Sequence, residues 1–111
     1  LTSVKACILA RRQLHEEAEA AISHAVEIGK GFGHFHHTAH NIASAYAAMG
    51  RPNEAIDWLE NAADEGFPNY TYFKVDPNLD PVREHPRFTD LMSRLEKQWI
   101  RFKEIAADPP N

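Results

Sequence analysis

Apolar residues recur every three to four positions along most of the chain, and no segment alternates apolar and polar residues as a strand would. This is the period of an α-helix, so the chain is predicted to be all-α. Gly29, Gly50 and Gly66 fall at predicted helix ends, where a left-handed residue commonly stops a helix. The apolar stripes predict five helices, over residues 2–13, 15–29, 36–49, 53–65 and 86–105.

The pattern repeats at an offset of 37 residues, which aligns "EAEAAISHAVEIG" (17–29) with "EAIDWLENAADEG" (54–66). Ala18 then matches Ala55, and Ala25 matches Ala62. Small residues at equivalent positions allow two helices to approach closely, and stacked neighbours bury the apolar faces that one helix pair leaves open. The self-match therefore predicts two copies of a helical hairpin.

The second copy resembles the tetratricopeptide repeat in the order of five residues, Tyr46, Gly50, Ala55, Leu59 and Ala62. The first copy departs from that pattern, because Leu9 stands at the aromatic position and Gln13 at the turn glycine. The offset of 37 also exceeds the usual repeat of about 34 residues. The resemblance implies a tetratricopeptide-like stack of two antiparallel helix hairpins, with repeats of about 1–33 and 36–67.

The remaining residues add to the resemblance, since "DPNLDPVREHPRF" (76–88) is similar to the closing segment of a group of bacterial tetratricopeptide proteins. Asp76 and Asp80 each precede a proline, a pairing that suits the first turn of a helix. We expect residues 68–111 to form this closing segment and a C-terminal capping helix, in the same domain as residues 1–67. The predicted apolar stripe of the capping helix comprises Phe88, Leu91, Met92, Leu95, Trp99 and Phe102.

Composition narrows the classes of partner. The formal net charge of −4 does not favour nucleic acid or an anionic membrane as the partner. No apolar stretch reaches the roughly 18 residues of a membrane span, and the single cysteine, Cys7, forms no internal disulfide. We therefore expect a cytoplasmic protein. Because the chain starts without methionine, we also expect it to be a fragment of a longer one.

Seven histidines raise the question of a metal site, and four of them lie within residues 31–40. His36 and His40 share a helix face, but tetrahedral zinc needs about four ligands and no acidic residue or cysteine lies nearby in sequence. A pair of Cys7 and His40, as thiolate and base or as two ligands, is the alternative. We expect no metal, no cofactor and no catalytic residue, and keep a His/Cys metal or redox site as an alternative.

The resemblance to the tetratricopeptide repeat also implies a function. It implies a groove lined by the first helix of each hairpin. The protein would be a protein–protein interaction module, not an enzyme, that binds a peptide or a helix of a partner protein. Six side chains would face or border this groove: Ser3, Cys7, His37, His40, Asn41 and Ser44.

The second alternative is a structural cap of a longer repeat array in a multidomain bacterial protein. In either case the first hairpin has one uncovered side, where Val4, Cys7 and Ile8 lie within about a turn of one another. We expect this N-terminal hairpin edge to mediate self-association as a homodimer. We expect Tyr70, Tyr72 and Phe73 to seal the last helix onto the second repeat.

Overall fold

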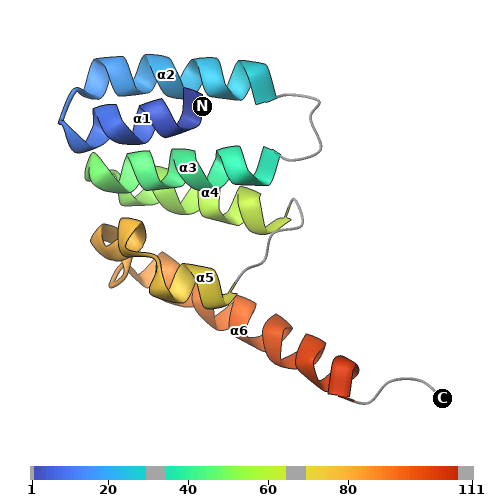
Figure 1. Ribbon diagram of the computed structural model, residues 1–111. Helices are drawn as coiled ribbons and strands as arrows, with labels where there is room; N and C mark the ends of the chain where they lie inside the picture. Colours follow the sequence, from blue (N-terminus) through green and yellow to red (C-terminus); the bar gives the residue numbers. More distant parts are fainter. Residues whose placement is uncertain (1, 30–34, 65–69, 108–111) are drawn as a thin grey trace.

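The computed structural model describes residues 2–29, 35–64 and 70–107, and all regular structure in these ranges is helical (Figure 1). The all-α prediction is confirmed for this part of the chain. The predicted domain boundaries near residues 33 and 67, as well as Gly66, lie outside the described residues. The elements in chain order are α1 (Thr2–Arg11), α2 (His15–Gly29), α3 (Phe35–Ala48), α4 (Pro52–Asp64), α5 (Tyr70–Val75), the 3₁₀ helix η1 (Pro77–Val82) and α6 (Pro86–Ala107).

Neighbouring helices pair along the chain, α1 with α2 and α3 with α4 (Figure 1). The pairs are joined across the first helix of each, because α1 packs extensively against α3. η1 then lies against both α3 and α4, and α6 contacts α4 and α5. Beyond these contacts α6 continues away from the rest of the molecule, as Figure 1 shows.

The turns of the two helix pairs have the same geometry. Gln13 and Gly50 both have a positive φ, 63° and 75°. The N–H of each donates to the carbonyl three residues back, and the next N–H donates to the carbonyl five residues back, at 2.9–3.1 Å. This is the pattern of a Schellman cap. The predicted equivalence of Gln13 with the turn glycine is confirmed, and the left-handed turn explains why α1 ends at Arg11 and not at residue 13.

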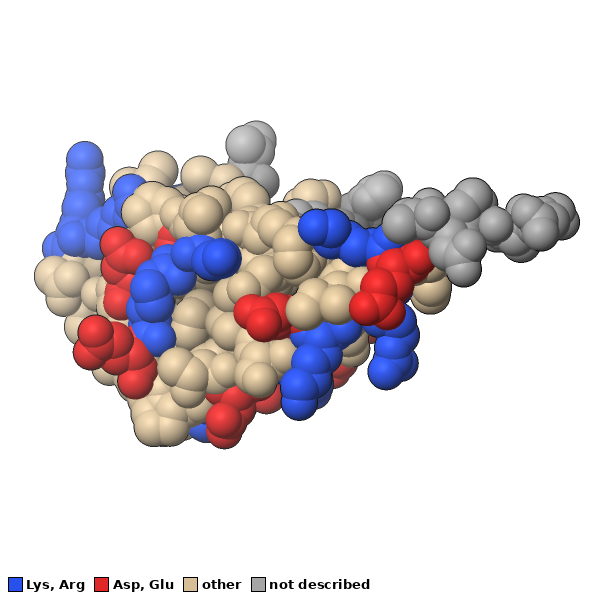
Figure 2. Space-filling model, turned by 90° about the horizontal axis from the view of Figure 1, so that it is seen from below, with Lys and Arg blue, Asp and Glu red and all other residues tan. Residues whose placement is uncertain are grey.

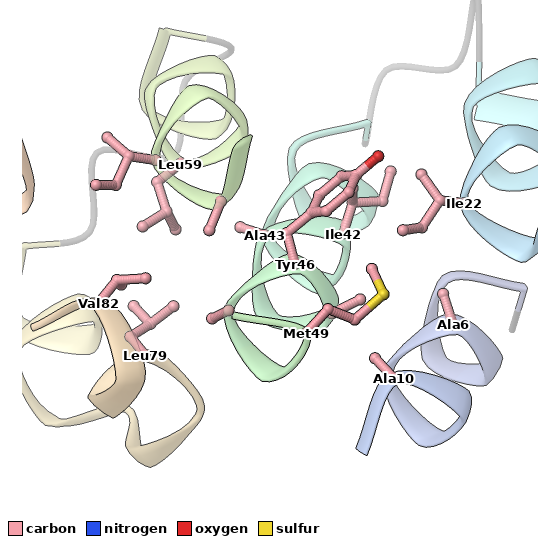
Figure 3. Close-up of a cluster of buried hydrophobic side chains, with 14 of the residues drawn as sticks. Ala6, Ala10, Ile22, Ile42, Ala43, Tyr46, Met49, Leu59, Leu79 and Val82 are labelled. Atoms are coloured by element: carbon pink, nitrogen blue, oxygen red, sulfur yellow. The ribbon is translucent and has the colours of Figure 1, made fainter. Parts of the chain in front are cut away.

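One cluster of buried apolar side chains extends from Ala6 in α1 to Leu95 in α6. Figure 3 shows α3 in the middle of this cluster, with Ile22 of α2 on one side and Leu59 of α4 on the other. Alanines fill the narrow places between the helices. The four that the self-match aligned are all buried: Ala18, Ala25, Ala55 and Ala62.

Residues 70–82 depart from the prediction, which placed no helix there. α5 has six residues and η1 has six, so neither is long enough to show a repeating apolar stripe. Tyr70 and Phe73 are buried in the core, as expected, whereas Tyr72 is 45% exposed.

The apolar stripe of α6 is covered along only part of its length. Phe88, Leu91 and Leu95 are buried, and Met92 and Trp99 are half-buried. Phe102, predicted to belong to the same packed stripe, is 64% exposed. The prediction was wrong at Phe102 because the helix extends beyond the elements that cover it.

Candidate functional site

Three of the predicted groove residues meet where α1 packs against α3. The Asn41 side-chain amide donates to Ser3 Oγ at 3.1 Å, and Cys7 Sγ donates to the backbone carbonyl of Asn41 at 2.9 Å. Ser3 is 6% exposed, and Cys7 and Asn41 are half-buried. The bonded residues are 34 and 38 positions apart in the sequence, so these hydrogen bonds fix the relative position of the two helix pairs.

His40 joins α3 to the segment that follows α4. Its Nε2 lies 2.8 Å from Asp76 Oδ2, and both side chains are buried. The imidazole stacks on Phe73 at 5.4 Å between ring centroids and meets Tyr72 edge-on at 5.0 Å. The other carboxylate oxygen of Asp76 accepts the Asn78 N–H at 3.0 Å and so caps η1. One carboxylate thus serves both a helix cap and an inter-element contact.

The structure places most of the predicted groove residues in structural roles. Ser3, His40 and Ser44 are buried, and the Ser44 hydroxyl donates to the His40 carbonyl at 3.2 Å. Of the six, only His37 is exposed. The Asp-Pro pairing predicted a helix cap at Asp76, which is confirmed, but no feature of the sequence indicated that Asp76 pairs with His40, 36 residues away.

The polar contacts of Ser3, Cys7, His40 and Asn41 form a seam between the elements, and exposed side chains border it. Val4 and Ile8, which are 47% and 52% exposed, lie on α1 within a turn of Cys7. His37 lies on α3 one turn before Asn41, and Tyr72 lies on α5 against His40. We call the four residues Val4, Ile8, His37 and Tyr72 the seam-border residues.

The chemistry available at Cys7 is restricted. The pKa of the Cys7 thiol is raised from 9.0 to about 11, chiefly by burial, while the positive charge of Arg11 lowers it and the negative charge of Asp76 raises it. A thiol with this pKa is protonated at neutral pH, whereas nucleophiles and metal ligands act as thiolates. The geometry also separates the predicted pair, because Cys7 donates to Asn41 while His40 pairs with Asp76.

Metal ligands do not gather in the part of the chain that the structure describes, where no three His, Cys, Asp or Glu side chains are placed to hold an ion. The His34 residue and the side chain of His36 lie outside the described residues. His40, the other member of the predicted histidine pair, has its Nε2 directed at Asp76.

Charges of both signs are mixed on the molecular surface, as Figure 2 shows for the face seen from below. Arg51 pairs with Glu19 and Glu54, and Arg87 pairs with Asp57 and Glu60. The acidic residues of α2 and α4 are therefore partly neutralised by arginines from neighbouring elements.

Among the described residues, none of the helices has the length and apolar character needed to cross a bilayer. No protein-family model, curated protein or solved structure matches the chain.

Proposed function

We propose that this chain is a tetratricopeptide-like interaction module that binds a peptide or helix of a partner protein along the row formed by α1, α3 and α5. Two observations support the proposal. The turns of the two helix pairs share one hydrogen-bond pattern at the offset of 37 residues. The α1–α3 packing also places the first helices of the two pairs side by side, as a stacked repeat requires.

The seam-border residues carry the proposal. Val4 and Ile8 offer exposed apolar surface, His37 adds a polar ring, and Tyr72 adds an aromatic ring with a hydroxyl. Aromatic side chains of this kind are frequent anchors in binding surfaces. The hydrogen bonds beneath them hold α1, α3 and Asp76, the residue that follows α5, in place before a ligand arrives, which lowers the entropic cost of binding.

The proposed activity is binding without chemistry. The only cysteine is protonated at neutral pH, and His40 is buried against Asp76, so neither is presented to a substrate as a reactive group. By the same resemblance to bacterial tetratricopeptide proteins, we place the module in the bacterial cytoplasm.

Peptide selection with site-specific crosslinking tests this proposal. Random peptides displayed on phage would be selected on the purified chain, and the selected peptides would be crosslinked to a photoreactive residue at Ile8, at Tyr72 or at Glu16. We expect crosslinks from the first two positions but not from Glu16, which lies on α2 and is exposed. We also expect Ile8→Glu and Tyr72→Ala each to weaken binding at least about tenfold. Crosslinks from Glu16 alone would contradict the proposal.

A second candidate is the structural one, in which another repeat or another copy covers the first hairpin. A groove of about 460 Å³ lies between α1 and α2. Leu9, Ala20 and Ala21 contribute its apolar lining, and Lys5 and Glu17 contribute opposite charges. This surface lies on the side of the hairpin where a preceding repeat would stack.

A further inference from the structure

An arginine followed by a large apolar residue occurs three times along α6, at intervals of seven residues. Seven residues make two helical turns, so the three arginines lie along one flank of the helix and the three apolar residues form a stripe beside them. The three pairs are Arg87-Phe88, Arg94-Leu95 and Arg101-Phe102.

In the first of these pairs the phenylalanine is buried and the arginine binds α4. Phe88 is 2% exposed, and the Arg87 guanidinium lies 2.7 Å from an Asp57 oxygen and 3.2 Å from a Glu60 oxygen. It also donates to the backbone carbonyl and the side chain of Asn53 at 3.2 Å. Asn53, Asp57 and Glu60 lie on one face of α4 at the i, i+4, i+7 spacing. The contact with α4 therefore shows that a helix with carboxylate and amide side chains at this spacing fits the arginine flank of α6.

The third pair is uncovered. Phe102 is 64% exposed and Ile105, one turn further on, is 60% exposed. Arg94 and Arg101 are exposed and have no ion-pair partner among the described residues. The cover ends at Trp99, whose ring lies 5.3 Å from that of Tyr70 in α5. Figure 1 shows the helix continuing past this point, away from the other elements.

We propose that the second half of α6 binds an amphipathic helix of a partner protein, one whose flank carries Asp or Glu residues three to four positions apart. The partner would lie on α6 as α4 does, with apolar side chains on Phe102 and Ile105 and carboxylates beside Arg94 and Arg101. Apolar burial supplies affinity in such a contact, and the paired charges supply selectivity. A groove of about 300 Å³ lies between α4 and the first half of α6, and it is lined by Glu60, Arg87, Asp90, Leu91 and Arg94.

A second copy of the chain does not fit this surface as well. Antiparallel pairing of two α6 tails would bring the arginine flank of one copy against the arginine flank of the other, because the positions that flank the apolar stripe face their own equivalents in that arrangement. Like charges opposed in this way weaken a contact. The surface lies on α6 and shares no residue with the seam-border residues, so its function is independent of the peptide binding proposed above.

A labelled helical peptide provides the probe. It would be about three heptads long, with leucine at a and d and glutamate at e and g, so that its own charges oppose self-pairing. Fluorescence anisotropy at low salt would measure its Kd for the full chain. We expect binding that Phe102→Ser and Arg94→Glu/Arg101→Glu each weaken at least about tenfold. We expect Phe102→Leu to keep most of the affinity and the same peptide with lysine at e and g not to bind.

The double variant Lys5→Glu/Arg12→Glu is the matched control, since it makes the same change of net charge on exposed residues at the other end of the molecule. It should leave the Kd unchanged. Circular dichroism should show every variant folded, because all the altered side chains are exposed. Equal binding of the lysine peptide, or an unchanged Kd in Phe102→Ser, would overturn the proposal. It would also be overturned if Phe102→Ser abolished self-association, or attachment to phosphatidylserine vesicles, without affecting peptide binding.

Discussion

At the scale of the residue, one carboxylate performs two tasks. Asp76 caps η1 through the Asn78 N–H and accepts a hydrogen bond from buried His40. Asp80, which also precedes a proline, lies within η1, where its exposed side chain pairs with Arg83. We therefore expect the two Asp-Pro motifs to contribute differently to stability, because the side chain of Asp76 is buried and that of Asp80 is exposed.

We expect Asp76→Ala to lower the free energy of unfolding by roughly 2–4 kcal/mol, since it removes a helix cap and leaves the imidazole without its partner. Asp80→Ala is the matched control and should cost at most about 1 kcal/mol, as surface ion pairs contribute little. Urea denaturation followed by circular dichroism would measure both. Equal losses in the two variants would show that the His40 contact contributes nothing to stability.

Cys7 offers a second test at this scale. Its thiol pKa of about 11, against 9.0 without the protein environment, leaves roughly 100-fold less thiolate at pH 8. We expect iodoacetamide to alkylate the folded protein about 100-fold more slowly than the urea-unfolded protein. The rate for the folded protein should keep rising as the pH increases towards 11. A fast reaction at pH 7 would instead support the redox alternative.

At the scale of the element, the two helix pairs share the geometry of their turns but have different residues at the left-handed position. Both turns require a left-handed residue, but the first has Gln13 where the second has Gly50. A side chain in this conformation costs roughly 1–2 kcal/mol, whereas glycine adopts it freely. Two hydrogen bonds from the Gln13 amide, both 3.4 Å long, offset little of this cost.

Because of this difference, exchanging glutamine and glycine between the two turns should have opposite effects on stability. Gln13→Gly should raise the midpoint of thermal unfolding, with a gain of up to about 1 kcal/mol, and Gly50→Gln should lower it by a similar amount. A Cβ at Gly50 would meet nothing within 4 Å, so the loss would come from the backbone alone. Calorimetry would measure both variants. Changes of the same sign at the two sites would mean that the turns are not equivalent.

At the scale of the whole molecule, the core joins every described helix, and apolar side chains remain uncovered at two places besides the seam-border residues. One is the groove between α1 and α2, and the other is the exposed end of α6. The outward apolar residues of α1 include Val4 and Ile8, as expected, but Cys7 directs its thiol towards α3. The residues predicted for the hairpin edge therefore differ from those that line the groove between α1 and α2, which include Leu9 and Ala20.

We predict that the chain associates through the N-terminal hairpin edge, at the groove between α1 and α2, with a second copy pairing by a two-fold axis. Light scattering over a dilution series should show a dimer that dissociates on dilution, and Ala20→Glu, which places a charge in this groove, should shift it to monomer. Phe102→Ser, at the other end of the molecule, should leave the dimer intact. A monomer at all concentrations would show that this edge has no partner surface on a second copy.

The sequence by itself determined the helical class, the two hairpins and their equivalent turns, because these depend on local spacing. The helical period places Ala55 and Ala62 on one face wherever the helix packs, and the offset of 37 residues predicted that Gln13 would occupy the place of Gly50.

Only the tertiary structure decided which side chains of these faces are buried. His40 was predicted to border a groove, but Asp76 reaches it from 36 residues away and removes it from the surface. Phe88 and Phe102 share one stripe of α6, yet only the first is covered, because α4 and α5 end before the helix does. A period in the sequence shows which face of a helix is apolar, whereas the extent of its burial depends on where other segments lie.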